Sequence, residues 1–92
     1  MPDEKLARAI RHRIRRDILH ILYEKEKASV HEIAKKLGIT ESSASKHLKL
    51  LYDLGFVGFK EKHPEKFYFL SIKEIRELFE IYDKIVEKMR KG

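Results

Sequence analysis

The segment that most limits how this chain folds is residues 29–55, which has the pattern of two short helices separated by a glycine. Ser29 stands three residues before a glutamate, the spacing of a capping box at a helix start. Gly38 ends the first helix, because glycine readily takes the left-handed conformation after a last turn. Thr40 is a favourable N-cap for a second helix, which ends at Gly55. The pattern predicts a compact helix-turn-helix.

Hydrophobic residues recur at helical spacing in this segment and define an inner face for each helix. The inner positions are Val30, Ile33, Ala34, Leu37, Ala44, Leu48, Leu51 and Leu54. The remaining positions of the second helix carry small polar or basic side chains, namely Ser42, Ser43, Ser45, Lys46, His47 and Lys49. A helix pair with this chemistry is suited to placing short polar side chains in the major groove of DNA. For His47, packing beside the core is an equally weighted alternative.

Helical periodicity also covers residues 3–25, where it fits either one long helix or two helices that break near residues 11–13. Residues 28–30 can form one short extended pairing before the helix-turn-helix. Aromatic residues with partial alternation predict strands at 56–62 and 67–71, joined by a polar loop that contains Pro64. These two strands make an antiparallel hairpin, or wing.

The last helix is expected over residues 71–91, because Ser71 and Glu74 repeat the capping-box spacing. Its apolar residues alternate at spacings of three and four, as in a coiled-coil seam: Ile72, Ile75, Phe79, Tyr82, Val86 and Met89. Such a seam can fill the core of one molecule or form a contact between two. The predicted fold is mainly α with a small antiparallel β-hairpin, a winged helix-turn-helix that forms one domain over residues 1–92.

Composition narrows the classes of function. The net charge of +6 favours a polyanionic partner, without distinguishing DNA from RNA or anionic lipid. The absence of cysteine excludes disulfides, thiolate metal sites and cysteine nucleophiles. The absence of Asn and Gln beside abundant Lys, Glu and Arg is typical of a thermophilic source. No apolar run is long enough for a membrane span and no signal peptide is visible, so we expect a cytoplasmic protein.

Three segments carry a resemblance to a known family. Residues 9–19, AIRHRIRRDIL, are similar to the opening A-L-x-H-P-x-R-x-x-I-L of the ArsR-type winged-helix transcriptional regulators. Residues 37–51, LGITESSASKHLKLL, resemble L-G-L-S-Q-S-T-V-S-x-H-L-K-x-L, and residues 54–57 with 67–70 resemble the L-G-L-V…Y-x-L of the wing. The chain departs from the pattern at Arg13, where the family usually has proline, and at Glu41, where glutamine is common.

The resemblance implies that residues 40–54 enter the major groove of double-stranded DNA and that Ser42, Ser43, Ser45, Lys46, His47 and Lys49 contact it. Four wing residues are expected either to contact flanking phosphates or to remain solvated: Lys60, Lys62, His63 and Lys66. The arginines at positions 11, 13, 15 and 16 leave two alternatives, contact with the DNA backbone or a solvated face with ion pairs to Asp17.

Helix-turn-helix proteins read two half-sites about one helical turn apart, which requires two copies in a fixed relation. We therefore expect a homodimer through the last helix on a palindromic operator. Its expected interface residues are Leu6, Ile10, Ile75, Phe79, Tyr82, Val86 and Met89.

Many proteins that resemble this family bind metal through Cys or through Asp, His and Glu of the last helix. Here the last helix has Asp83 and Glu87 but no histidine, and the five histidines lack ligand spacing, so we predict no metal and no cofactor. No catalytic motif stands out in the sequence. The aromatic residues lie mostly at core-like positions, whereas proteins that bind single-stranded RNA expose aromatic rings on which bases stack. The leading hypothesis is a sequence-specific DNA-binding regulator, most simply a repressor. The alternative is a winged-helix protein-interaction or architectural module that binds nucleic acid weakly.

Overall fold

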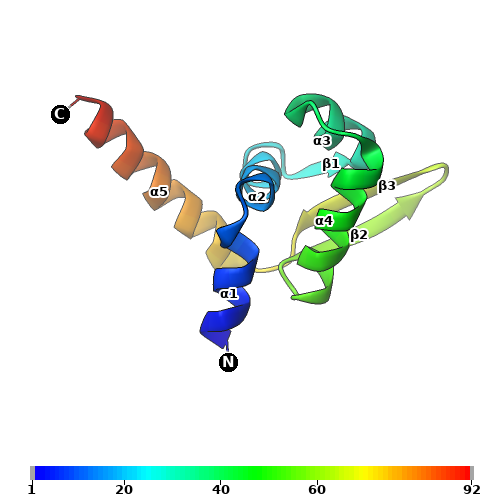
Figure 1. The fold of residues 1–92 in the computed structure, drawn as a ribbon, viewed down its shortest axis with the longest axis horizontal. Helices are drawn as coiled ribbons and strands as arrows, with labels where there is room; N and C mark the ends of the chain where they lie inside the picture. Colours follow the sequence, from blue (N-terminus) through cyan, green and yellow to red (C-terminus); the bar gives the residue numbers. More distant parts are fainter. Residues whose placement is uncertain (1, 92) are drawn as a thin grey trace.

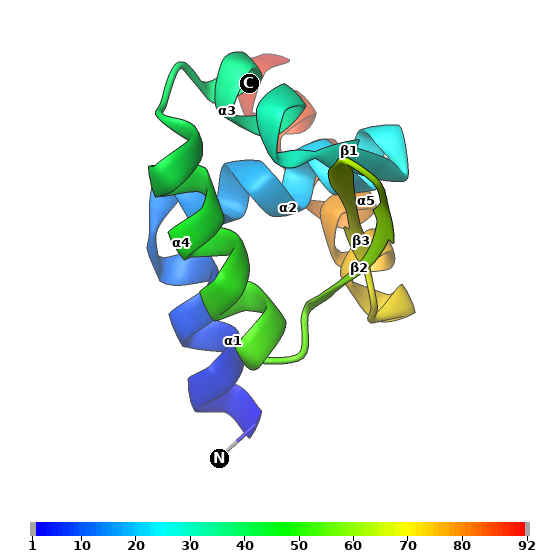
Figure 2. The ribbon, with the colours of Figure 1, turned by 90° about the vertical axis from the view of Figure 1, so that its right-hand side faces the viewer.

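The computed structural model describes residues 2–91, with side chains from residue 4 onward, and it contains five helices and a small three-stranded sheet (Figures 1 and 2). The helices are α1 (Pro2–Arg11), α2 (Arg13–Lys25), α3 (Val30–Leu37), α4 (Glu41–Asp53) and α5 (Lys73–Lys91). The strands are β1 (Lys27–Ser29), β2 (Val57–Lys62) and β3 (Glu65–Leu70). This order confirms the predicted winged helix-turn-helix.

Two helices, not one, precede the helix-turn-helix. The chain breaks at His12, which is extended (φ −85°, ψ 127°) and whose Nδ1 accepts a hydrogen bond from the Ile14 amide at 3.2 Å. The Arg16 guanidinium donates to the carbonyl oxygens of Ile10 and Arg11 at 2.7 and 3.0 Å. These carbonyls lack helical partners at the end of α1, so Arg16 stabilises the break from the side of α2.

The helix-turn-helix has the caps that the sequence predicts. The Glu32 amide donates to Ser29 Oγ and the Ser29 amide donates to Glu32 Oε1, both at 3.1 Å, which completes the capping box. Gly38 is left-handed at φ 67°. Thr40 Oγ1 accepts from the Ser43 amide at 3.0 Å and starts α4. Each of these bonds joins residues within three positions, so they form as soon as the local turn does.

The sheet has the order β1-β3-β2 and is antiparallel throughout. The short pairing expected at residues 28–30 is β1, which pairs with β3 and lies one residue earlier than predicted. Tyr68 and Val57 are buried on the inner face of the sheet. Phe67 and Phe69 lie half-buried on the other face, because β3 alternates its side chains between the two faces.

The core lies where α2 crosses α3, α4 and the sheet (Figure 2). Its largest fully buried side chains are Ile18, Leu19, Leu22, Ile33, Leu48 and Leu51. Because α2 supplies three of these six, it holds the helix-turn-helix on one side and α5 on another. None of the helices of the described chain is long and apolar enough to cross a membrane.

The start of α5 differs from the prediction. The helix begins at Lys73, and the second capping box expected at Ser71 is wrong. Ser71 Oγ instead donates to the Gly55 carbonyl at 2.7 Å, and the Ser71 amide donates to the Phe56 carbonyl at 3.1 Å. Ser71 therefore ties the end of the wing to the end of α4, a bond between positions far apart in the sequence.

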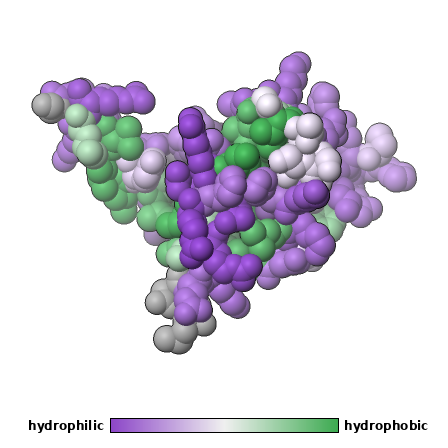
Figure 3. All heavy atoms as spheres, in the orientation of Figure 1, coloured by the Kyte–Doolittle hydropathy of each residue, from purple (hydrophilic) through white to green (hydrophobic). Residues whose placement is uncertain are grey.

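The apolar seam of α5 is divided between two roles. Ile75 and Phe79 are only 4% and 5% exposed and pack in the core of the same molecule. The sequence predicts them at the dimer interface, but their side chains are already buried within one copy. Beyond them α5 extends away from the body (Figure 1). Five other apolar side chains of α5 are 41–75% exposed: Leu78, Ile81, Tyr82, Ile85 and Met89. Figure 3 shows apolar side chains gathered along this helix.

Candidate nucleic-acid interface

The outward side of α4 is polar along its length. Ala44, Leu48 and Leu51 are fully buried and hold α4 against the core. At about 100° per residue, the opposite side of the helix carries Ser42, Ser45, Lys46 and Lys49, and all four are exposed. The Thr40 cap fixes where α4 begins, so it also fixes which side chains this face presents. Four of the six α4 residues named for DNA contact are therefore exposed together on one side of the helix.

The other two named residues lie on a flank of α4. Ser43 and His47 are half-buried, and the His47 ring centroid is 4.7 Å from that of His12 at the α1–α2 break. Burial lowers the pKa of His47, and the nearby His12 and Arg15 lower it further. The lowered pKa favours the neutral form of the ring, which faces α2. Of the two alternatives for His47, the structure favours packing beside the core, because its helical angle lies about 40° from that of the buried Leu51.

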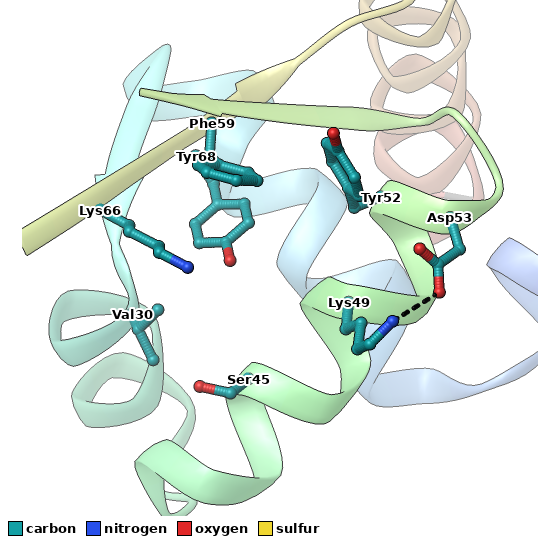
Figure 4. Close-up of a pocket in the computed structure, with 8 residues that line it drawn as sticks. All are labelled: Val30, Ser45, Lys49, Tyr52, Asp53, Phe59, Lys66 and Tyr68. Atoms are coloured by element: carbon teal, nitrogen blue, oxygen red, sulfur yellow. Dashed lines mark hydrogen bonds and ion pairs between the residues drawn. The ribbon is translucent and has the colours of Figure 1, made fainter. Parts of the chain in front are cut away.

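A groove of about 380 Å³ separates α4 from the wing (Figure 4). Ser45, Lys49 and Tyr52 line it from α4 at spacings of four and three, and Phe59 and Lys66 line it from the wing. The Tyr52 and Phe59 rings lie 5.2 Å apart, and Lys66 Nζ lies 4.9 Å from the Phe59 centroid. The groove is therefore floored by aromatic rings and edged by hydroxyl and ammonium groups.

Tyr52 is a site residue that the sequence reasoning missed. Its side chain is 48% exposed and points into the groove beside Phe59 (Figure 4). The signal was present, since Tyr52 lies seven positions after Ser45 and such positions share one helix face. Tyr68, deeper in the same groove, is buried, and this burial raises the pKa of its hydroxyl.

The four named wing residues do not share one surface. In the register of the hairpin, Lys66 lies opposite Glu61 on the face that is turned toward α4. Lys60 lies opposite Phe67, on the other face of the sheet. Lys62 is two residues after Lys60 and lies on that same outer face, which also carries Phe69. His63 is exposed at the tip, in the turn between the strands. The hairpin register decides this division.

Ion pairs reduce the positive charge near the site only weakly. Lys49 Nζ is 3.1 Å from Asp53 Oδ2, and both side chains are more than half exposed. His31 Nδ1 is 3.1 Å from Glu41 Oε2 at the start of α4. Exposed pairs of this kind contribute about 0–1 kcal/mol, so Lys49 can leave Asp53 for a phosphate at small cost. Lys46 has no acidic group within 4.0 Å among the described residues.

The structure joins one histidine to the last helix. His20 Nε2 lies 3.1 Å from Asp83 Oδ1, a contact between α2 and α5 that the spacing along the chain did not indicate. Among residues 4–91, no three histidine, aspartate or glutamate side chains come together as a set that could hold a metal ion. The His20–Asp83 contact fastens α5 to α2, together with the Arg76 guanidinium, which donates to the Tyr23 carbonyl at 2.7 Å.

Comparison with known proteins agrees with this geometry. HlyU from Vibrio cholerae N16961 is 27% identical, with a TM-score of 0.84 over 91% of this chain and 90% of HlyU. The transcriptional repressor BigR from Xylella fastidiosa is 24% identical, with a TM-score of 0.81 over 89% of this chain and 83% of BigR. The homodimeric winged helix-turn-helix DNA-binding domain of Mb0332 from Mycobacterium bovis, a possible ArsR-family transcriptional regulator, is 20% identical, with a TM-score of 0.83 over 96% of this chain and 81% of that domain.

The sequence match is more specific than the shared fold. Residues 12–58 match the profile of the family described as bacterial regulatory protein, arsR family. The match begins at the α1–α2 break, covers the whole helix-turn-helix and ends in the first strand of the wing. Since it includes more than half of the residues, the chain belongs to the arsR family of regulatory proteins.

Proposed function

We propose that this protein is a homodimeric transcriptional regulator that binds double-stranded DNA at a specific, palindromic operator, with α4 in the major groove. The observation that carries the proposal is the outward face of α4, where Ser42, Ser45, Lys46 and Lys49 are exposed together on a capped helix-turn-helix. Membership of the arsR family supports the same function.

The side chains of this face suit both parts of DNA recognition. Lysine ammonium groups neutralise phosphates and release counterions, which gives affinity that falls with salt. Serine hydroxyls donate to or accept from base edges and phosphates, and their small size lets the helix backbone approach the bases closely. Tyr52, beside Ser45 and Lys49, adds a hydroxyl and a ring edge at the side of the helix that faces the wing.

The wing would contact the DNA backbone beside the groove. Lys66 faces α4 and His63 lies at the exposed tip, so these two are the proposed phosphate contacts. Lys60 and Lys62 lie on the outer face of the sheet and contribute charge at longer range. The hairpin carries no arginine, the residue that narrow minor grooves attract, so its role is backbone contact rather than base readout.

The proposed dimer uses the exposed side of α5. Leu78, Ile81, Tyr82, Ile85 and Met89 line this side, and Val86 is half-buried beside it. From α1, Leu6 and Ile10 are half-buried against the core and can complete the contact. A two-fold axis through α5 would place two copies of α4 in a fixed relation, as reading two half-sites requires. Bound to a promoter, such a dimer would act as a repressor by occlusion.

Selection of bound sites from random duplex DNA, followed by footprinting, tests this function. We expect a palindromic site with half-sites about one helical turn apart and an affinity that falls steeply with salt. The double variant Ser45→Glu and Lys46→Glu should lower affinity for that site by more than about a hundredfold, because phosphates and carboxylates repel. The control Lys84→Glu makes the same lysine exchange on α5 and should bind as the wild type does.

The alternative functions give different results in the same assay. Equal affinity for every duplex sequence would indicate an architectural protein. If DNA binding and regulation survive the Ser45→Glu and Lys46→Glu pair, α4 is not the working surface and a protein-interaction module is the better description.

A further inference from the structure

A second group of basic side chains, three arginines and two histidines, lies beside α4, at the α1–α2 junction. Arg8 and Arg11 come from the last turn of α1, His12 from the break and Arg15 from the first turns of α2. His47 of α4 completes the group through its 4.7 Å ring contact with His12. Figure 3 shows strongly hydrophilic side chains over this junction, on the same face of the molecule as α4. None of the five belongs to the recognition face described above.

Arg15 is the member of this group with unmet hydrogen-bonding capacity. Its side chain is half-buried, and its Nε is buried without a hydrogen-bond partner among the described residues. A buried donor without an acceptor destabilises the folded protein, so such donors usually have a partner in the working state of a protein. An anion at the junction would supply that acceptor.

Among residues 4–91, no acidic group lies within 4.0 Å of the guanidinium groups of Arg8, Arg11 and Arg15. Burial lowers the pKa of Arg15, and repulsion from Arg8 and Arg11 lowers it further. Asp17, the nearest acid in sequence, lies instead on the other side of α2, where its Oδ2 is 3.9 Å from Arg13 Nε. Several guanidinium groups close together without an acidic partner are typical of a site that binds an anion.

The position of the group identifies the anion. A helix in the major groove has a sugar-phosphate backbone along each of its two sides. The wing and Lys66 lie beside one flank of α4, at the groove that Ser45 and Tyr52 line. The junction lies beside the other flank, which carries His47. The two flanks of α4 thus each carry a cationic group at the place where a backbone would pass.

We propose that the α1–α2 junction is a second phosphate-binding site, in which Arg11, His12 and Arg15 hold the DNA backbone on the flank of α4 opposite the wing. This inference rests on the proposed function. Guanidinium groups suit the task because their planar set of donors matches two phosphate oxygens at once. The site gives affinity and register on the duplex but carries no base preference.

The test measures DNA affinity by fluorescence anisotropy over a range of salt concentrations, on the selected operator and on a scrambled duplex. Arg11→Gln and Arg15→Gln should each weaken binding to both duplexes by the same factor, roughly tenfold. Each should also reduce the slope of log K against log salt by about 0.9, the value for one lost phosphate contact. Arg13→Gln is the matched control, since it removes the same charge on the opposite side of α2 and should keep the wild-type slope.

Arg15 is half-buried, so thermal unfolding is measured for its variant, and the exposed Arg11 keeps the test independent of folding. An unchanged slope in Arg11→Gln and Arg15→Gln, with salt-dependent binding by the wild type, would overturn the junction site and leave the proposed function standing. An equal loss in Arg13→Gln would also overturn it, because the effect would then be one of net charge. Wild-type protein without salt-dependent DNA binding would overturn both.

A second measurement separates the DNA backbone from a free anion. Ring proton signals of His12 and His47 should shift when duplex DNA is added and should be unaffected by inorganic phosphate at constant ionic strength. A shift with inorganic phosphate alone would show that the junction takes a small anion, against the proposal.

Discussion

Replacing Ile85 with glutamate should convert the proposed dimer into monomers. Ile85 is 52% exposed on the apolar side of α5, and full burial of an isoleucine contributes about 1.5–3 kcal/mol. Burying the exposed half therefore contributes about 1 kcal/mol in each copy, or ~2 kcal/mol per dimer. A carboxylate in this apolar contact adds a desolvation cost of several kcal/mol. The sum, roughly 5 kcal/mol, corresponds to more than about a thousandfold weaker dimerisation.

Sedimentation equilibrium at micromolar concentration measures this change directly. The wild type should have twice the 11.0 kDa mass of one chain, and Ile85→Glu should have the mass of one chain. The control Lys84→Glu places the same carboxylate one position earlier, about 100° around α5, and should remain dimeric. The core contacts of Ile75 and Phe79 are unchanged by both variants, so both should unfold cooperatively.

Two results would refute this reasoning. A wild-type mass of 11.0 kDa at micromolar concentration would show that the apolar side of α5 does not join two copies. A dimer that persists in Ile85→Glu would show that the two copies meet through another surface.

Two further predictions concern the monomer. Ser29→Ala should lower the free energy of unfolding by about 1 kcal/mol, since Ser29 is 2% exposed and caps α3. Thermal unfolding should then show a Tm about 4–8 °C lower. The control Ser42→Ala, at an exposed position, should have a Tm close to that of the wild type. Burial places the pKa of folded His47 below its usual 6.5, so the unfolded chain binds the proton first and stability falls as pH decreases from about 7.5 to 5. In His47→Gln, Tm should depend less on pH over this range. The control His63→Gln, at the wing tip, should show the same pH dependence of Tm as the wild type. Equal curves for the wild type and His47→Gln would show that His47 does not cause the pH dependence.

The features that the sequence predicts correctly are those made by neighbouring residues. The Ser29 capping box, the left-handed Gly38 and the Thr40 cap each depend on bonds within a few positions. The inner faces of α3 and α4 follow from helical periodicity alone, and so does the exposed set on α4. These local signals carry enough information for the helix-turn-helix and most of its outward face.

The features that the sequence leaves open or places wrongly depend on contacts between distant elements. The break at His12 depends on Arg16, which reaches back across the junction to the end of α1. Ser71 has the spacing of a cap, yet the Gly55 carbonyl takes its hydroxyl. His47 is polar, yet its angle on α4 directs it toward α2.

By itself, the sequence determines that two capped helices and a hairpin form, because short-range hydrogen bonds and alternation of apolar residues specify them. Only the tertiary structure decides how one apolar seam on α5 is used, with Ile75 and Phe79 in the core and Ile81 and Ile85 left exposed. It also decides that Arg15 joins the cations beside α4 while Arg13 faces away. The physical reason is that periodicity shows which side chains share a face, whereas the packing of helices against one another determines what that face meets.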